Sequence, residues 1–289
     1  MNDTPFPIHT IGVVGCGLMG AGIVEVSARR GYQVVVREVT QELLHGGLGR
    51  IRKSLDKGLE RAKLTQDEHA AALDRIRGTT ELADLADCDL VIEAIVENLD
   101  TKRALFAELD AITPARAILA SNTSSISITK LAAATNRPGQ VIGLHFFNPV
   151  PVMPLLEIIR GLQTSDETFV AAQAWGQALG KTMVVAAKDN PGFIVNLLFV
   201  PYSLDAIRGL EQGVATKEDF DTAMKLGMNH PMGPFELMDF VGLDTVLFIA
   251  DAMYEETRDP RYAAPPLLRR LVAAGHMGRK SGRGFYEYK

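Results

Sequence analysis

The sequence predicts an α/β protein in which a larger amino-terminal part forms a mostly parallel sheet and the remainder is helical. From Thr10 to about Ala187, short runs rich in β-branched residues alternate with longer segments of helical periodicity, a pattern typical of βαβ units. A glycine-rich turn joins the first of these runs to the first helical segment. Beyond Lys188 only the helical period remains, so a second, all-α part is expected there.

Short apolar runs bounded by turn residues are predicted to form the strands of this sheet. They begin at Thr10, Gln33, Asp89, Ala117, Val141, Leu155 and Met183. The segments between them are amphipathic, and the one after the third run places Leu105, Leu109 and Ile112 on one helical face. Thr164 followed by Glu167 is typical of a capping box that starts the last helix of this part.

The helical part opens with an unusually apolar segment. DNPGFIVNLLFVPYSLDAIRGLEQG, from Asp189, predicts one long helix bent at Pro201, and Thr216 with Asp219 predicts the cap of the next helix. We place an α/β domain at residues 1–187 and a helical domain at residues 188–289. The helical domain is small and its first segment is unusually apolar, so we expect it to pack against a second copy of the chain. The sequence therefore predicts a homodimer formed through the helical domain.

Composition excludes several classes of function. The 35 acidic residues outnumber the 30 basic ones and no long like-charge block occurs, so a nucleic-acid partner is not expected. Cys16 and Cys88 are the only cysteines and lack metal-ligand spacing, which indicates a reducing compartment and no metal. No apolar run reaches the ~18 residues that span a bilayer. Because the first residues, MNDTPFPIHT, lack the features of a secretory signal, we expect a cytoplasmic protein.

The glycine-rich turn has the spacing of a dinucleotide-binding site. VVGCGLMG, from Val13, matches GxGxxG between a strand and a helix, which is the context the motif requires. Gly15 permits the tight turn, Gly17 lets the backbone approach a pyrophosphate, and Gly20 lets the helix lie close to the strand. The phosphates then meet the positive end of the helix. The motif predicts a Rossmann-like domain, although glycine turns also join strands to helices for purely structural reasons.

An acidic residue at the end of the second run favours NAD as the cofactor. Glu38 lies where a carboxylate accepts hydrogen bonds from the adenosine ribose and repels a 2′-phosphate. The alternative is an ordinary solvated acid at a strand end. Arg37 is a complication, because an arginine there can accommodate a 2′-phosphate. Turn, helix and Glu38 together predict NAD rather than NADP.

Three charged residues follow the third predicted strand. Glu93 and Glu97 lie in VIEAIVENLDTK just past that strand, at the edge of the sheet where ligands bind in such folds, and Lys102 follows on the next helix. The alternative is a solvated helix start with Asp100 as its N-cap.

A histidine at a strand end is the candidate general base. Removing a hydroxyl proton during hydride transfer needs a group that titrates near neutrality and is held in place. His145 ends the run VIGLHF, at the edge where the nicotinamide is expected, and Glu157 lies in the next run. Positions 145 and 157 are symmetric about Pro151, so a hairpin would make them cross-strand neighbours. The carboxylate would then fix the imidazole tautomer, whereas a lone strand-end histidine is more often structural.

Several longer motifs resemble the L-3-hydroxyacyl-CoA dehydrogenase family. They are SNTSSISI from Ser121, GLHFFNPVPVMPLLEII from Gly143, DNPGFIVN from Asp189 and NHPMGPFELMDFVGLDT from Asn229. The similarity extends from the glycine turn to GRKSGRGFYEYK at the carboxyl end. It implies a Rossmann-like domain followed by a helical dimerisation domain. It also implies reversible oxidation of a 3-hydroxyacyl-CoA, a short-chain one being favoured, to the 3-ketoacyl-CoA with NAD, as in fatty acid β-oxidation.

The resemblance assigns roles to individual residues. His145 resembles the catalytic base and Glu157 its partner, while Ser124 and Asn196 resemble the residues that hold the substrate's C3 oxygen and thioester region. The resemblance also implies that Lys102 contacts the cofactor and approaches the substrate. Further cofactor contacts are implied at Leu18, Met19, Glu97 and Asn122.

Two of these residues also have ordinary structural interpretations. Ser124 lies in a serine-rich loop, where hydroxyls often cap backbone amides, and Asn196 could bond to a neighbouring helix. Asn196 is nevertheless polar within an apolar run, and burying it without a partner costs about 1–3 kcal/mol. A ligand is one way to satisfy its amide.

Some positions depart from the family's common pattern. Leu197 stands where arginine is common, Pro154 where lysine is frequent, and Glu38 where aspartate is usual. These changes bear on recognition of the CoA or acyl tail and on cofactor detail. Lys53 and Lys57, with Arg52, form a basic cluster. We expect this cluster either to bind CoA phosphates or to be the solvated face of a helix.

Two rival functions stay open. One is a dehydrogenase of the same fold acting on a small 3-hydroxy acid without CoA, such as a sugar acid or carnitine. The other is a silent binding or structural protein, against which the retained Glu38, His145, Glu157 and Asn196 argue.

Overall fold

The computed structural model describes residues 6–288 and divides the chain into two compact units. One unit ends at Asp189 and the other begins at Asn190, two residues beyond the predicted boundary. None of the described helices is both long and apolar enough to cross a membrane.

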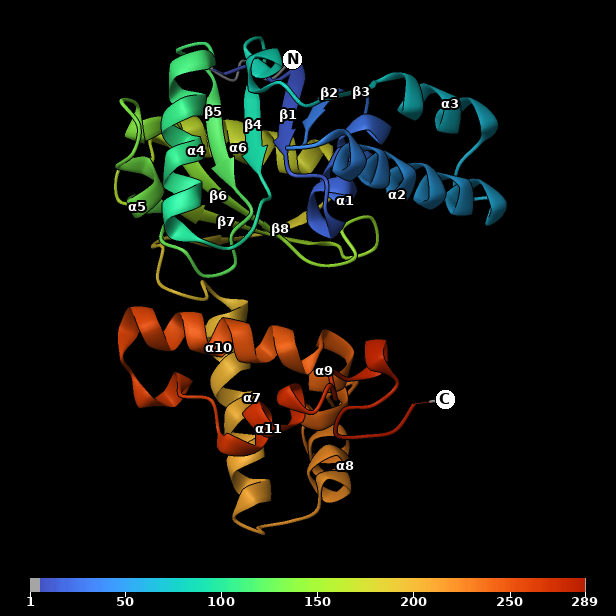
Figure 1. Ribbon diagram of the computed structural model, residues 1–289, viewed down its shortest axis with the longest axis vertical. Helices are drawn as coiled ribbons and strands as arrows, with labels where there is room; N and C mark the ends of the chain where they lie inside the picture. The colour runs from blue at the N-terminus through green and yellow to red at the C-terminus, as the bar shows by residue number, and fades with distance from the viewer. Residues whose placement is uncertain (1–5, 289) are drawn as a thin grey trace. The chain divides into compact units, whose positions relative to one another are not determined.

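The first unit is built on one sheet whose strand order is β3-β2-β1-β4-β5-β6-β7-β8 (Figure 1). All neighbouring pairs are parallel except β6 and β7, which are antiparallel, so the predicted mostly parallel sheet is confirmed. The strands are β1 (Thr10–Val14), β2 (Gln33–Arg37), β3 (Ile76–Thr79), β4 (Leu90–Glu93), β5 (Ile118–Ser121), β6 (Val141–Phe146), β7 (Leu155–Arg160) and β8 (Thr182–Ala186).

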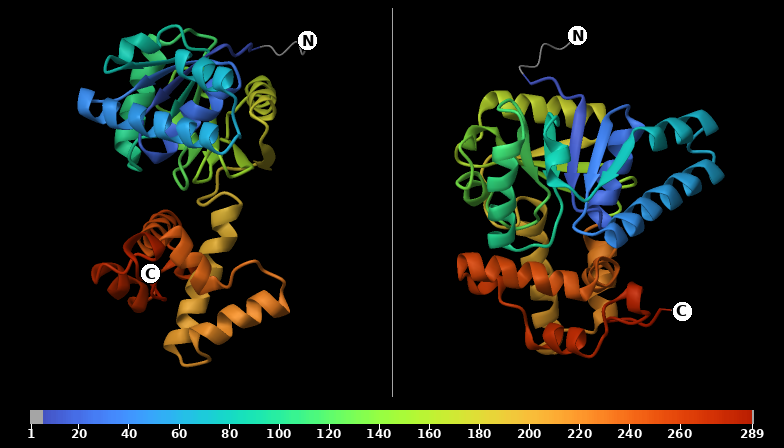
Figure 2. Two further views of the ribbon diagram at one scale, coloured as in Figure 1. Left: turned by 90° about the vertical axis from the view of Figure 1, so that its right-hand side faces the viewer. Right: turned by 45° about the horizontal axis from the view of Figure 1, so that its top comes forward.

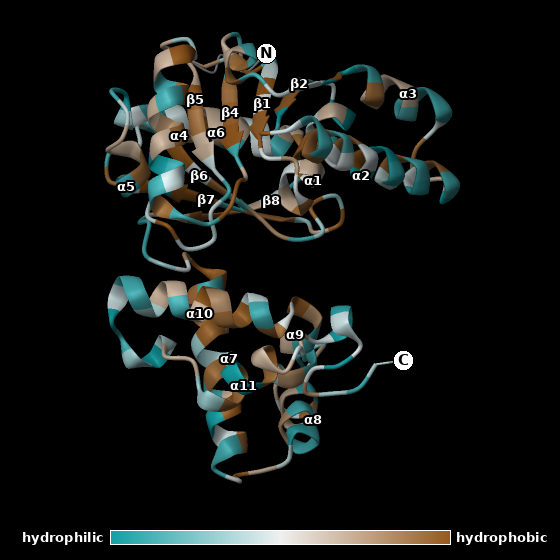
Figure 3. Ribbon diagram, viewed as in Figure 1, coloured by the Kyte–Doolittle hydropathy of each residue, from teal (hydrophilic) through white to brown (hydrophobic). Residues whose placement is uncertain are grey.

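Burial on both faces explains the apolar runs. Every residue of β4, β5 and β6 is buried, and these central strands are mostly hydrophobic in Figure 3. Strand β3 is not predicted from the sequence, because this edge strand reads IRGT and buries only Thr79. A short edge strand with a glycine and an exposed arginine shows no alternation and is specified by its pairing with β2.

Helices cover both faces of this sheet (Figures 1 and 2). A core cluster joins α1 and α6 to side chains of the same sheet face, and α4 packs with α5 against the other face. In Figure 1, α2 and α3 extend beyond the edge strand β3. The helices of this unit are α1 (Leu18–Arg29), α2 (Gln41–Glu60), α3 (Gln66–Asp74), α4 (Leu99–Ile112), α5 (Ile128–Ala132) and α6 (Asp166–Ala178).

One predicted helix cap of this unit, Thr164, and one that was given as an alternative, Asp100, are wrong by one or two residues. The N-cap of α6 is Ser165, whose hydroxyl accepts from the Thr168 amide, whereas the Thr164 hydroxyl donates to the Val141 carbonyl. The N-cap of α4 is Asn98 rather than Asp100. In both cases the cap is a neighbouring polar residue with the same capping chemistry, which occupies the position where the helix begins.

The second unit is helical, with α7 (Val195–Glu211), α8 (Lys217–Gly227), α9 (Pro234–Val241), α10 (Leu243–Thr257) and α11 (Pro266–Ala273). The predicted cap is confirmed, since the Thr216 hydroxyl accepts from the Asp219 amide. Helix α7 continues through Pro201 but begins later than predicted. Gly192 and Phe193 adopt φ of +80° and +50°, so the left-handed backbone there delays the helix until Val195.

Two buried aspartates hold the last residues of the chain onto this helical unit. Asp239 accepts hydrogen bonds from the amides of Phe285 and Tyr286 and from the Tyr288 hydroxyl. Asp221 accepts from the Tyr286 hydroxyl at 2.8 Å. The sequence predicted a helical segment here, and this prediction is wrong. The final segment is irregular and contains isolated β-bridges.

Candidate active site

The candidate site gathers where parallel strands end. Because β1, β2, β4, β5 and β6 run in one direction, the residues that follow them meet at one edge of the sheet. The glycine turn, Glu38, Glu93, the loop after Ser121 and His145 all lie at or next to these strand ends.

The glycine turn has the close contacts that its spacing predicts. Gly15 has φ of +95°, and a Cβ atom there would lie 2.6 Å from the Ala94 carbonyl oxygen. A Cβ atom on Gly20 would lie 1.8 Å from the Gly15 carbonyl oxygen, so only glycine lets α1 approach the turn. Nothing lies within 4 Å of a Cβ built on Gly17, so its backbone faces open space.

The amino terminus of α1 fits the pyrophosphate of a dinucleotide. Gly17 is the N-cap, no side chain caps the helix, and its first turn holds no acidic residue. The side chain of Leu18 is 70% exposed, so it does not cover the helix end. The first amides of α1, which include those of Leu18 and Met19, are left for an anion that the helix dipole attracts.

Glu38 contacts the glycine turn directly. Its carboxylate accepts from the Cys16 amide at 2.6 Å and from the Val39 amide at 3.1 Å. Arg37 is held elsewhere, because its Nε donates to the Thr80 carbonyl at 3.2 Å. Arg50 of α2 donates to the Cys16 carbonyl and was not singled out from the sequence, since its place against the turn depends on how α2 packs.

Glu93, Glu97 and Lys102 form a buried charge network rather than a solvated helix start. The Lys102 side chain is 1% exposed, and its Nζ lies 2.5 Å from Glu93 Oε1 and 3.0 Å from Glu97 Oε2. Glu93 is the last residue of β4, not a residue past it, and is fully buried. The Ser121 hydroxyl donates to the second oxygen of Glu93 at 2.6 Å. Charged groups that are buried from solvent are stable only when groups of opposite charge lie beside them, as Lys102 does beside the two carboxylates.

Glu97 orders the loop that follows β5. Its carboxylate accepts from the Thr123 hydroxyl, the Ser124 amide at 3.0 Å and the Ser125 hydroxyl at 3.3 Å. Burial alone would raise the pKa of Glu97, but the charge of Lys102 and these hydrogen bonds outweigh it and lower the pKa. The carboxylate is therefore ionised at neutral pH and fixes the backbone of Ser124.

The same loop leaves a hydroxyl available and ties itself to β6. The Ser124 hydroxyl makes no hydrogen bond within the part of the chain that the structure describes. Asn122 accepts from the Phe146 amide at 2.9 Å, which joins the end of β5 to the end of β6. Side-chain hydrogen bonds thus hold the loop after β5 to Glu97 and, through Asn122, to the end of β6.

His145 and Glu157 face each other across the one antiparallel strand pair. The register of β6 and β7 pairs these two residues directly, as the predicted hairpin requires. His145 Nδ1 lies 2.6 Å from Glu157 Oε2, with His145 6% exposed and Glu157 fully buried. The ring of Phe147 lies beside the imidazole, with centroids 4.6 Å apart. This arrangement directs Nδ1 of the imidazole at the carboxylate, and a carboxylate in that position fixes the orientation of the ring.

Lys53 and Lys57 lie on α2 and line a cleft of about 260 Å³. The opposite walls are the first turns of α1, from Leu18, and the loop from Asn148 to Pro151 that follows His145. Arg52, the third member of the basic cluster, does not line the cleft.

Asn196 belongs to the second unit. It lies in the first turn of α7, and its side chain is buried in an otherwise apolar stretch. The residues that the structure describes contain no cluster of three or more metal-ligating side chains.

The fold and this edge of the sheet define a dinucleotide-binding dehydrogenase. Residues 10–190 match the family profile for the 3-hydroxyacyl-CoA dehydrogenase NAD binding domain, and residues 192–288 match the profile for the C-terminal domain of these enzymes. The chain belongs to the 3-hydroxyacyl-CoA dehydrogenase family. The predicted family, fold class and NAD cofactor are confirmed by these matches.

Characterised relatives resemble the chain over nearly its full length. The 3-hydroxybutyryl-CoA dehydrogenase of Mycobacterium tuberculosis is 51% identical over 97% of this chain and 99% of its own. The human mitochondrial hydroxyacyl-coenzyme A dehydrogenase is 48% identical over 98% of this chain and 92% of its own. The crystal structure of (S)-3-hydroxybutyryl-CoA dehydrogenase from Ralstonia eutropha is 47% identical, with a TM-score of 0.92 over 98% of this chain and 100% of that one.

Proposed function

We propose that the protein oxidises a short-chain (S)-3-hydroxyacyl-CoA, such as 3-hydroxybutyryl-CoA, reversibly to the 3-ketoacyl-CoA. The observation that carries this proposal is the His145–Glu157 pair, which lies at the same edge of the sheet as the glycine turn. The names of the relatives support the substrate class.

The catalytic step assigned to this chain is proton removal. His145 Nε2 accepts the proton of the C3 hydroxyl, and the positive charge that develops on the imidazole is stabilised by Glu157 through the 2.6 Å contact at Nδ1. Because both groups are buried, this contact is stronger than it would be in water. The Ser124 hydroxyl and the Asn196 amide orient the C3 oxygen and the thioester region.

Bound NAD would supply the hydride acceptor for oxidation at C3, and residues at the edge of the sheet would hold it. Gly15, Gly17 and Gly20 shape the turn for its pyrophosphate, with the amides of Leu18 and Met19 as donors. Glu38 receives the adenosine ribose and disfavours a 2′-phosphate. Glu97, Lys102 and Asn122 hold the nicotinamide side of the site through the network that they form with the loop after β5.

The substrate's CoA portion is assigned to the cleft between α1 and α2. Lys53 and Lys57 line this cleft, which the loop after His145 also borders. A pantetheine arm lying there reaches toward the strand end that carries the base. Pro154 and Leu197, which depart from the family's common pattern, bear on the tail of the substrate and not on the proton transfer.

The proposal is tested by following NADH consumption with acetoacetyl-CoA, longer 3-ketoacyl-CoA substrates and free acetoacetate. Rapid turnover of acetoacetyl-CoA alone among the short substrates is expected. Equal turnover of free acetoacetate would identify a dehydrogenase of small 3-hydroxy acids instead. Binding of NADH without turnover of any of these compounds would identify a silent binding protein.

We further propose that two copies of the chain assemble through their helical units and act in the cytoplasm. Several large apolar side chains of this unit are exposed, which supports a covered surface. They include Leu198, Leu226, Met228, Phe240 and Phe248. The unpaired, buried Cys16 and Cys88 are compatible with a reducing compartment. Light scattering during gel filtration should give twice the mass of the chain, and cell fractionation should place the protein with soluble enzymes.

A further inference from the structure

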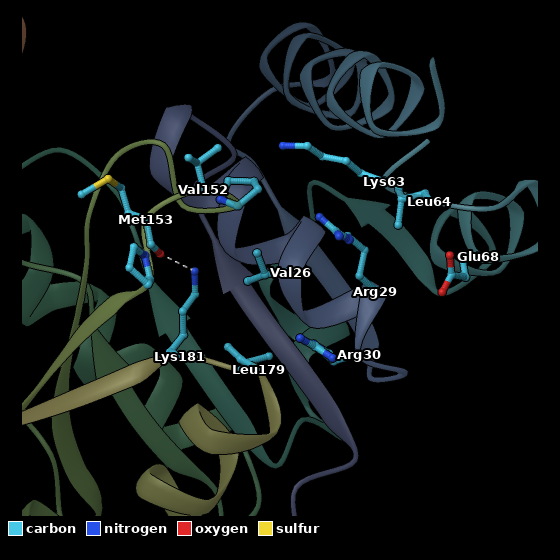
Figure 4. A pocket seen from close by; sticks show the side chains of 13 residues that line it. Val26, Arg29, Arg30, Lys63, Leu64, Glu68, Val152, Met153, Leu179 and Lys181 are labelled. Carbon is cyan, nitrogen blue, oxygen red and sulfur yellow. Dashed lines mark hydrogen bonds between the residues drawn. The ribbon is translucent and has the colours of Figure 1, made fainter. Parts of the chain in front are cut away.

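A second cavity of the first unit has no part in the proposed chemistry but concentrates positive charge. Its volume is about 320 Å³, and it lies between the carboxyl-terminal end of α1, the turn from α2 to α3, the loop after β6 and the end of α6. Arg29, Arg30, Lys63 and Lys181 line it, with Glu68 as its one acidic residue. In Figure 4 the nitrogen ends of the four cations surround a shared space, and Glu68 lies apart from them on α3.

Two of these cations have no partner among residues 6–288. Arg30 and Lys63 make no side-chain hydrogen bond or ion pair there, whereas Arg29 pairs with Glu25 at 3.4 Å. The Nζ of Lys181 donates to neutral groups, the carbonyls of Val150 at 2.6 Å and Met153 at 2.8 Å. Among residues 6–288, Arg29 is therefore the only one of the four cations that forms an ion pair with an acid, and the positive charge around the cavity is only partly balanced.

The one lining acid is already occupied. Glu68 accepts from the Thr65 amide at 2.8 Å in the capping box of α3. The pKa of Lys181 is lowered, first by burial and then by repulsion from Arg29 and Arg30, which is the effect of an only partly compensated positive field. Such a field is notable in a chain whose formal net charge is −5.

Backbone geometry keeps one of the cations in the cavity. Gly180 has φ of +76°, and a Cβ atom there would lie 2.6 Å from a terminal nitrogen of Arg30. A residue with a side chain would be strained in this backbone and would also displace the guanidinium. The end of α6 thus leaves room for Arg30 beside Lys181.

The cavity continues the cleft that contains Lys53 and Lys57. Residues of α1 from Leu18 to Glu25 line the cleft and residues from Val26 to the end of the helix line the cavity, with Pro151 in the wall of both. A helix of 12 residues is about 18 Å long, so the two form successive parts of a groove along α1. The groove begins beside the loop after His145 and ends at the basic cavity.

We propose that this cavity binds a phosphate group, as a monoester or a diphosphate. Guanidinium and ammonium groups that converge with few acidic partners match the oxygens of a phosphate. The continuous groove favours the nucleotide end of the acyl-CoA as the source, and that part of the inference rests on the proposed function. A free phosphate-bearing compound is the other source of the same chemistry.

The test uses the Arg30→Gln/Lys63→Gln double variant, because both side chains are exposed and lack structural partners. Arg103→Gln, on the exposed face of α4 and outside both cavities, is the control for loss of a positive charge elsewhere on the unit. The KM for acetoacetyl-CoA should rise about tenfold in the double variant with little change in kcat. The KM for acetoacetyl-pantetheine, which lacks the phosphates, should not change, and the control should behave as the parent enzyme.

Calorimetric titration with inorganic pyrophosphate separates the two sources. Loss of pyrophosphate binding in the double variant, with the KM for acetoacetyl-CoA unchanged, supports the phosphate site and assigns it to a separate ligand. Unaltered pyrophosphate binding together with an unaltered KM overturns the proposal. If the parent enzyme does not reduce acetoacetyl-CoA at all, the proposed function fails, and the titration still decides whether the cavity binds phosphate.

Discussion

Replacing Glu157 by glutamine should slow turnover while leaving the site intact. Glutamine keeps the shape of the side chain but removes the charge that faces His145 Nδ1 at 2.6 Å. A hydrogen bond to a charged group contributes about 1.5–3 kcal/mol. If this energy is realised when the imidazole becomes positive, kcat should fall by roughly 10-fold to 150-fold. The assay is the initial rate of NADH consumption with acetoacetyl-CoA.

A double-mutant cycle shows whether the two residues act together. Because Glu157 is proposed to work only through His145, adding Glu157→Gln to His145→Gln should cause little further loss. Glu108→Gln, at an exposed position of α4, is the matched control and should retain parent activity. Thermal unfolding must show that the Glu157→Gln protein is folded. A folded variant whose kcat lies within about a factor of two of the parent would refute the assigned role.

Three further changes test other parts of the site. His145→Ala should lower kcat by ~10²-fold to 10⁴-fold, with NAD affinity in calorimetry nearly unchanged, and normal turnover would remove it as the base. Glu38→Gln keeps an acceptor for the glycine turn but loses the charge, so the ratio of kcat/KM for NAD over NADP should fall; an unchanged ratio would show that the charge does not select the cofactor. Lys102→Met leaves two buried carboxylates without their cation and should cost about 3–5 kcal/mol of unfolding free energy, measured with urea. Because folding lowers the pKa of Glu97, its stabilisation is present above the ordinary value of about 4.3 and is lost as pH falls through the lower folded value. The same variant should flatten this acid dependence of Tm, and an identical pH profile would contradict the network.

The parts of the molecule that follow local rules were predictable from the sequence. The glycine turn is set by Gly15 and Gly20, where a side chain would clash with backbone atoms, and by Gly17, where a side chain would enter open space. The pairing of His145 with Glu157 follows from symmetry about Pro151, because an antiparallel hairpin fixes its own register once its centre is known. In both cases the residues that form the motif lie within a short stretch of chain.

Features that depend on distant packing were not predictable. The strand Ile76–Thr79 has little apolar character and exists because β2 offers it a paired edge. The contacts of Glu97 with the loop at 123–125 join segments more than two dozen residues apart and require β4 and β5 to be neighbours. The strand order supplies that information, whereas the residue types alone left a solvated helix start equally open.

The antiparallel turn between β6 and β7 has a consequence for how substrate preference can diverge. The two strands hold His145 and Glu157 in register, and the loop that joins them forms a wall of both the cleft and the basic cavity. Substitutions in that loop, such as proline at 154, alter the lining of the groove without shifting the strand pairing beneath it. Under the proposed function, the loop of this hairpin contributes to substrate selectivity and its two strands carry the proton-transfer pair. Exchanging this loop between relatives, at constant length, is therefore a route to new acyl-carrier preferences with the proton-transfer pair retained.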